Sequence, residues 1–199
     1  QAQALKILNE WAGQPLPISA SCWIGNSAGG EGQLMIRLAG AAAAIQAAIP
    51  VMSSLILATE VDPQIASTFW KDLREQKLAY FNRIGDKQTL YRLALPAACG
   101  PLNIPHAANE IVLEWHGQQR WIIAPGDEAT FEKIKQIATN HGGHASRFKQ
   151  GAGVDPMLQR FTLLSEQVVT PMGILQAIRV MAGSLIFVKK PMRYIKKKT

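Results

Sequence analysis

The stretch EIVLEWHGQQRWIIAPGDEATFEKIKQIATNHGGHASRF, residues 110–148, decides the fold. Two apolar runs flank His116-Gly117-Gln118, a pattern typical of a β-hairpin. An acidic start, apolar residues at three- and four-residue steps, and Gly142-Gly143 just beyond predict a helix over residues 127–140. A strand is expected to follow over residues 144–148. The stretch is therefore a strand pair, a helix and a further strand.

The rest of the chain repeats these two patterns. Alternation of apolar and polar residues predicts strands over residues 18–24, 33–38 and 89–95. Helical spacing predicts helices over residues 1–13, 41–48, 62–77 and 157–169. Asp62 is the expected N-cap of the third helix, with Pro63 as its first residue. Pro50 is expected to interrupt the second helix, and residues 51–58 are either helix or strand. We therefore predict an α+β fold, an antiparallel sheet of hairpins packed by helices on one side, of the ferredoxin-like, split-βαβ kind.

Length and charge limit the function classes. The 199 residues are 48% hydrophobic, which suits one globular domain and excludes a disordered chain. The formal charge of +7 lies mostly in residues 184–199, whose six Lys and Arg residues leave about +1 for the body. We expect a domain over residues 1–183 and a basic C-terminal tail over residues 184–199. Because the body lacks a basic stripe, no nucleic-acid partner is expected.

The cysteines and the apolar C-terminal segment bear on location. Cys22 and Cys99 lie far apart without ligand-type spacing, so neither a metal site nor a disulfide is expected, and a cytoplasmic setting is predicted. No signal peptide is expected at the start of the chain. Residues 172–188 followed by the basic tail allow peripheral contact with the inner face of a membrane. A packed terminal helix with a solvated tail is the favoured alternative.

Several candidate sites have simpler structural explanations. Gly29-Gly30-Glu31-Gly32 resembles a phosphate loop, but a strand follows it, so a hairpin turn is favoured. The two histidines of residues 141–144 lack an acid or thiol cluster and are better explained by a helix C-cap. Arg92 stands alone in an apolar strand, where a guanidinium either binds a small carboxylate or faces solvent. Arg120 has the same two interpretations.

Five strings carry a family resemblance in their order and spacing: NEWAGQPLPISASCWI, FWKDLREQKLAYF, LYRLALP, LEWHGQQRWI and NHGGHASRF. Together they cover most of residues 4–150. They resemble the C-terminal half of the FAD-binding subunits of bacterial glycolate oxidases, flavoproteins related to vanillyl-alcohol oxidase and D-lactate dehydrogenase. The resemblance implies a cap domain over the flavin and substrate, without the N-terminal FAD-binding domain.

The resemblance also implies an activity and residue roles. An FAD-dependent enzyme of this kind oxidises a small 2-hydroxy acid, glycolate to glyoxylate, in a complex with a larger flavin subunit and an iron–sulfur subunit. By resemblance, Arg92 would hold the substrate carboxylate and His144 would act as the base. Arg120, Arg147 and Gln176 would face the cofactor, Gln176 standing where the family's closing motif has Asn.

Two functions remain open at this stage. The chain is either a substrate-oxidising part of such a subunit or a non-catalytic module for assembly or electron transfer, docking on the flavin and iron–sulfur partners. In either case we expect the chain alone to hold FAD poorly and to be inactive by itself.

Overall fold

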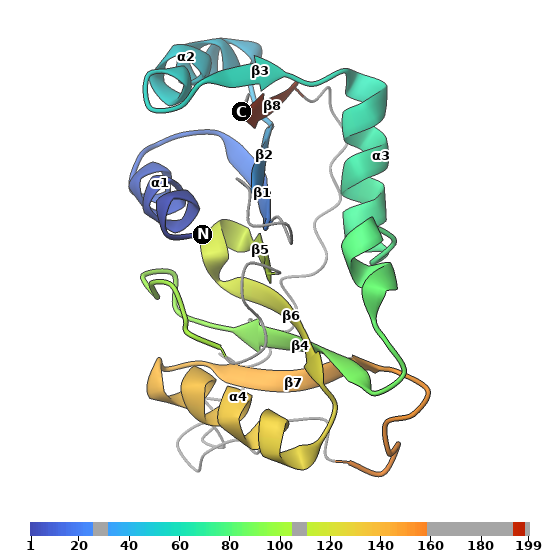
Figure 1. Ribbon diagram of the computed structural model, residues 1–199. Helices are drawn as coiled ribbons and strands as arrows, with labels where there is room; N and C mark the ends of the chain where they lie inside the picture. Colours follow the sequence, from blue (N-terminus) through green and yellow to red (C-terminus); the bar gives the residue numbers. More distant parts are fainter. Residues whose placement is uncertain (26–31, 105–110, 159–192, 198–199) are drawn as a thin grey trace, which may run out of the picture.

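The computed structural model describes residues 1–25, 32–104, 111–158 and 193–197. Its strands form one eight-stranded sheet in the order β3-β8-β2-β1-β5-β6-β4-β7, and neighbouring strands pair antiparallel (Figure 1). The strands are β1 (Ile18–Ile24), β2 (Gln33–Leu38), β3 (Ala58–Glu60), β4 (Gln88–Ala94), β5 (Ile111–Glu114), β6 (Gln119–Pro125), β7 (His144–Gln150) and β8 (Arg193–Lys197). The helices are α1 (Ala2–Ala12), α2 (Ala42–Ser53), α3 (Pro63–Arg74) and α4 (Glu128–Asn140), with short 3-10 turns at Ala79–Arg83 (η1) and Trp115–Gly117 (η2). The predicted α+β class is confirmed.

The turn between β5 and β6 is built from left-handed residues. Trp115 (φ 51°), His116 (φ 57°) and Gly117 (φ 85°) follow one another. A Cβ on Gly117 would lie 2.3 Å from Cδ2 of Leu5, so glycine is needed both for its backbone angle and for its small size. The His116 backbone N–H donates to Ser21 Oγ at 2.8 Å and ties the turn to β1. The predicted hairpin is thereby fixed to α1 and β1.

Capping side chains set the starts of two helices as predicted. Asp62 accepts hydrogen bonds from the backbone N–H groups of Gln64 and Ile65 at the start of α3. Asp127 accepts one from Thr130 at the start of α4. The helix expected before Pro50 continues to Ser53, which is the helical alternative left open for residues 51–58. Met52, which is fully buried, makes that last turn part of the core.

The helices lie on both sides of the sheet. We call one side the three-helix face, because α1, α2 and α4 pack there against residues such as Trp23 and Ile122. We call the other side the α3 face, because α3 and η1 pack there against Cys22 and Trp121. Figure 1 shows α3 on the opposite side of the sheet from α1 and α2. The expectation that all helices share one side is therefore wrong for α3. Trp70 and its apolar neighbours on α3 form a stripe that a second sheet face must bury.

The basic end of the chain enters the sheet. Arg193–Lys197 forms β8, which pairs with β2 on one side and β3 on the other. The favoured expectation of a solvated tail is therefore wrong for these five residues, since their backbone is hydrogen-bonded between two strands. The helix expected at 157–169 falls largely outside the described residues, as do the apolar segment at 172–188 and most of the glycine-rich turn.

The described part of the chain contains no helix both long and apolar enough to cross a membrane.

Candidate functional site

A row of registered residues crosses the α3 face and carries the candidate chemistry. His144 on β7 pairs with Ala94 on β4, and Ala94 pairs with Gln119 on β6. Gln119 in turn pairs with Glu114 on β5, and Glu114 pairs with Cys22 on β1. Paired residues in a sheet point to the same side. We call His144, Gln119 and Glu114, with Arg92 in the adjacent position of β4, the polar row.

Hydrogen bonds join most of this row into one chain. Arg92 Nε donates to Gln119 Oε1 at 2.9 Å, and Gln119 Nε2 donates to Glu114 Oε1 at 3.0 Å. Trp121 Nε1 donates to the same Glu114 oxygen. Gln119 and Trp121 are buried, while Arg92 and Glu114 are half-buried. The guanidinium of Arg92 is thus held by its Nε edge at the border between core and surface.

Burial sets the charge state of the two ionisable ends of the chain. It raises the pKa of Glu114, against the hydrogen bonds from Trp121 and Gln119 and the charge of Arg92, which lower it. Burial lowers the pKa of Arg92, and the Glu114 charge opposes that shift. An arginine nevertheless stays protonated in proteins, so Arg92 is a cation at neutral pH.

His144 stands beside Arg92 on the same face. Arg92 pairs with Ser146, two residues from His144 along β7, so Arg92 and His144 are diagonal neighbours. Such residues lie about 7–8 Å apart, and their Cβ atoms are somewhat closer. His144 is exposed. Partial burial of its ring, and then the positive charge of Arg92, lower its pKa below the ordinary 6.5. At pH 7 the imidazole is therefore neutral and able to accept a proton.

Arg120 lies on the opposite, three-helix face. Its Nε donates to the carbonyl of Gly117 at 3.0 Å, Nη1 to Gly100 at 2.8 Å and Nη2 to Cys99 at 2.6 Å. The residue is fully buried. It therefore fastens the segment after β4 to the β5–β6 turn, and its bonds give no support to the predicted cofactor contact.

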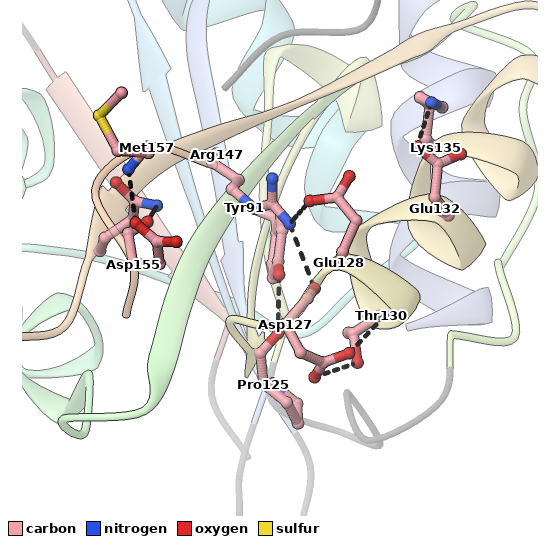
Figure 2. A network of polar contacts seen from close by, with 11 residues as sticks. Tyr91, Pro125, Asp127, Glu128, Thr130, Glu132, Lys135, Arg147, Asp155 and Met157 are labelled. Carbon is pink, nitrogen blue, oxygen red and sulfur yellow. Dashed lines mark hydrogen bonds and ion pairs between the residues drawn. The ribbon is translucent and has the colours of Figure 1, made fainter. Parts of the chain in front are cut away.

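Arg147 also lies on the three-helix face, at the start of α4. Figure 2 shows its Nη2 between the carbonyl of Asp127, at 3.2 Å, and Glu128 Oε2, at 3.0 Å. Its Cζ lies 4.1 Å from the ring centroid of Phe131. The Tyr91 hydroxyl, beside it in Figure 2, donates to the Pro125 carbonyl at 2.7 Å. Arg147 thus anchors α4 to the sheet, which leaves its predicted cofactor role likewise unsupported.

Gln176 and the histidines of residues 141–144 were further candidates for a site. Gln176 lies outside the described residues. Within the part of the chain that the structure describes, no three His, Cys, Asp or Glu residues gather in a way that could hold a metal ion. His141, at the C-cap of α4, has Nδ1 2.8 Å from the carbonyl of Ile137, which matches a capping role.

Glu114 and Gln119 are the members of the polar row that sequence reasoning missed. A partial signal was present, because the two polar residues lie close to the predicted turn, but they become opposite partners only because the observed turn also includes Trp115. Glu114 is also a lone carboxylate at the end of the apolar run Ile-Val-Leu. The pairing of this hairpin with β4, which brings Arg92 alongside, depends on tertiary register and has no local signal.

Comparison with known proteins finds a similar sequence. Glycolate oxidase subunit GlcE of Escherichia coli K12 is 32% identical over 184 residues, which is 90% of this chain and 46% of that protein. No family model matches the chain, and no solved structure matches it. The chain is therefore similar in sequence to glycolate oxidase subunit GlcE, and it spans about half the length of this curated relative.

Proposed function

We propose that this chain forms the substrate-facing part of a glycolate oxidase flavin subunit, acting on a small 2-hydroxy acid within a multi-subunit complex. The single observation that carries the proposal is the placement of Arg92 and His144 as diagonal neighbours on one sheet face. The likeness to a glycolate oxidase subunit supplies the substrate class.

The two residues have complementary roles in this proposal. Arg92 offers a cation with its Nε already held, so its remaining nitrogens suit the two oxygens of a carboxylate. His144, neutral at pH 7, accepts the proton of the 2-hydroxyl group. Oxidation to the 2-oxo acid also removes a hydride from the carbon, and FAD, which the family resemblance implies, is the proposed acceptor.

The flavin itself is not assigned to residues of this chain. Arg120 and Arg147 direct hydrogen bonds at protein carbonyls and at Glu128, which gives no support to a flavin contact. The proposal therefore places FAD in the portion of the longer relative that this chain does not cover, and the larger flavin and iron–sulfur subunits as partners. Peripheral membrane contact through residues 184–199 stays a prediction.

One observation favours the second candidate function, a docking module for assembly or electron transfer. Strand β7 lies at one edge of the sheet. Phe148 on this strand is 45% exposed, and the centroid of its ring lies 4.8 Å from that of the Trp121 ring. An edge strand with an exposed aromatic residue is suited to a partner surface.

Binding of glycolate by calorimetry tests the first function. We expect glycolate to bind, ethane-1,2-diol (which lacks the carboxylate) not to bind, and Arg92→Met to abolish glycolate binding. Arg74→Met is the matched control, because Arg74 has 74% of its side chain exposed and pairs only locally with Glu75. His144→Asn should retain binding and lose turnover in the assembled enzyme. Glycolate binding that is unaffected by Arg92→Met would contradict the proposal, and intact assembly of that variant with normal turnover would favour the docking module.

A further inference from the structure

We infer that Gln119 and Glu114 are positioning residues that orient Arg92 for anion binding, Gln119 by direct contact and Glu114 through Gln119. The inference rests on the proposed function, because it takes Arg92 as the group that binds the substrate carboxylate. It adds two residues to which neither the family likeness nor the sequence patterns assign a role.

The side-chain amide of Gln119 has a defined orientation. An ionised carboxylate can only accept hydrogen bonds, so the NH₂ group of Gln119 must face Glu114. The amide oxygen then has to face the opposite way, where it accepts from Arg92 Nε. Glu114 and Arg92 thereby select the same orientation of the Gln119 amide. A reversed amide would set two donors against each other at Arg92.

Gln119 keeps the charged groups of Arg92 and Glu114 apart. Among the described residues, no carboxylate lies within 4.0 Å of the Arg92 guanidinium. Gln119 spans the gap to Glu114 with a neutral group that occupies only Nε. A direct Arg–Glu pair would instead be bidentate and would fill the edge that a substrate carboxylate needs. The arrangement therefore holds the cation firmly and leaves its charge without a contact ion pair in the described part of the chain.

Glu114 is itself held by a packed cluster of aromatic residues. Glu114 Oε1 also accepts from Trp121 Nε1, and Trp121 is 2% exposed. The Trp121 ring packs edge-on against Phe81 at 5.6 Å, and the Trp121 backbone carbonyl accepts from the Tyr80 hydroxyl at 3.0 Å. The chain that ends at Arg92 thus begins in a packed aromatic cluster, as an oriented binding group requires.

The test compares four variants by two measurements. Gln119→Met keeps the side-chain volume and removes both hydrogen bonds, and Glu114→Ala removes the group that orients Gln119. Glu114→Gln can retain both donors, since both bond to the same oxygen, and Gln118→Met is the matched control at an exposed neighbouring position. The measurements are the ¹H–¹⁵Nε signal of Arg92 without ligand, with its exchange rate with water, and the dissociation constant for glycolate.

We expect Gln119→Met and Glu114→Ala to speed exchange of the Arg92 Nε proton and to weaken glycolate binding about tenfold, the factor for losing one hydrogen bond to a charged group. Glu114→Gln and Gln118→Met should leave both measurements near wild type. In an Arg92→Met background, Gln119→Met should have no further effect on glycolate binding, because the two residues act as a unit.

The outcomes separate this inference from the proposed function. An unchanged Arg92 Nε signal in Gln119→Met, or equal weakening of binding by Gln119→Met with and without Arg92, would overturn the positioning role. Glycolate binding that does not depend on Arg92 would overturn the proposed function, and Arg92 would then have no role in substrate binding. The Arg92 Nε signal would still report whether Gln119 holds the Arg92 side chain.

Discussion

The structural role of Arg120 leads to the sharpest prediction about folding. Arg120→Met keeps most of the side-chain length and removes three hydrogen bonds, to the carbonyls of Gly117, Gly100 and Cys99. If Arg120 instead served a bound cofactor, as the family resemblance implied, the variant would alter ligand binding and leave folding intact.

The magnitude follows from two opposing terms. Each hydrogen bond from a charged donor is worth about 1.5–3 kcal/mol, so three of them set an upper bound of roughly 4.5–9 kcal/mol. The variant also removes a fully buried guanidinium, whose desolvation costs several kcal/mol in the folded state. We expect a net loss of about 3 kcal/mol in the free energy of unfolding.

Urea unfolding followed by tryptophan fluorescence measures this loss. With a slope of about 2 kcal/mol per molar urea, the midpoint of Arg120→Met should fall by about 1.5 M. The exposed control Arg74→Met should stay within about 0.5 kcal/mol of wild type. A loss below about 1 kcal/mol for Arg120→Met, at an unchanged slope, would refute the anchoring role and return Arg120 to the candidate ligand contacts.

Three further predictions concern titration and packing. The His144 imidazole should titrate below pH 6.5 by NMR, and Arg92→Met should raise its pKa, because the Arg92 charge is one of the two causes that lower it; an unchanged value would show that the two groups do not interact. Burial raises the pKa of Glu114 in the folded protein. The wild-type protein therefore loses unfolding free energy as the pH rises from the unfolded-state pKa near 4.5 through the folded-state pKa. The unfolding free energy of Glu114→Gln relative to wild type should therefore increase over that range, and a difference independent of pH would contradict the assignment. Gly143→Ala should lose about 2 kcal/mol in thermal unfolding, because its Cβ would lie 2.2 Å from the backbone oxygen of Ala94, whereas Gly100→Ala, with open space around it, should be near neutral.

Local signals explain why most elements could be predicted from the sequence. The helix α4 has an N-cap aspartate, a period of apolar residues and glycines beyond its end, all within one short window. The strands β1 and β2 were predicted at their observed bounds, since alternation and the intervening turn are also local. Where neighbouring residues carry the information, the sequence patterns predict the element.

The points that the sequence left open or that were predicted wrongly share a dependence on tertiary contacts. The continuation of α2 through Pro50 relies on burial of Met52 against the core, which outweighs the local effect of proline. Strand β8 exists because the backbones of β2 and β3 offer it partners on both sides. Its lysine-rich composition alone indicates a solvated segment. Neither outcome is visible in a short window of sequence.

The candidate site shows the same limit at single-residue resolution. Arg92 and Arg120 each stand in an apolar strand, and their local contexts do not differ in any way that assigns a face. In the structure Arg92 pairs with Trp121, and Leu93 pairs with Arg120. Because side chains alternate along a strand, this one-residue offset places the two arginines on opposite faces. Register, rather than composition, therefore separates the anchoring arginine from the candidate binding arginine.

That separation gives the two faces different responses to substitution. On the three-helix face, Arg120 and Arg147 direct bonds at protein oxygens within the core, so their replacement should reduce stability first. On the α3 face, the half-buried side chain of Arg92 makes one hydrogen bond to a described residue, so its replacement should reduce anion binding and cost less stability than that of Arg120, which makes three. One sheet thus combines two arrangements: buried arginines fasten the scaffold on the three-helix face, and a neutral glutamine holds the proposed binding arginine on the α3 face.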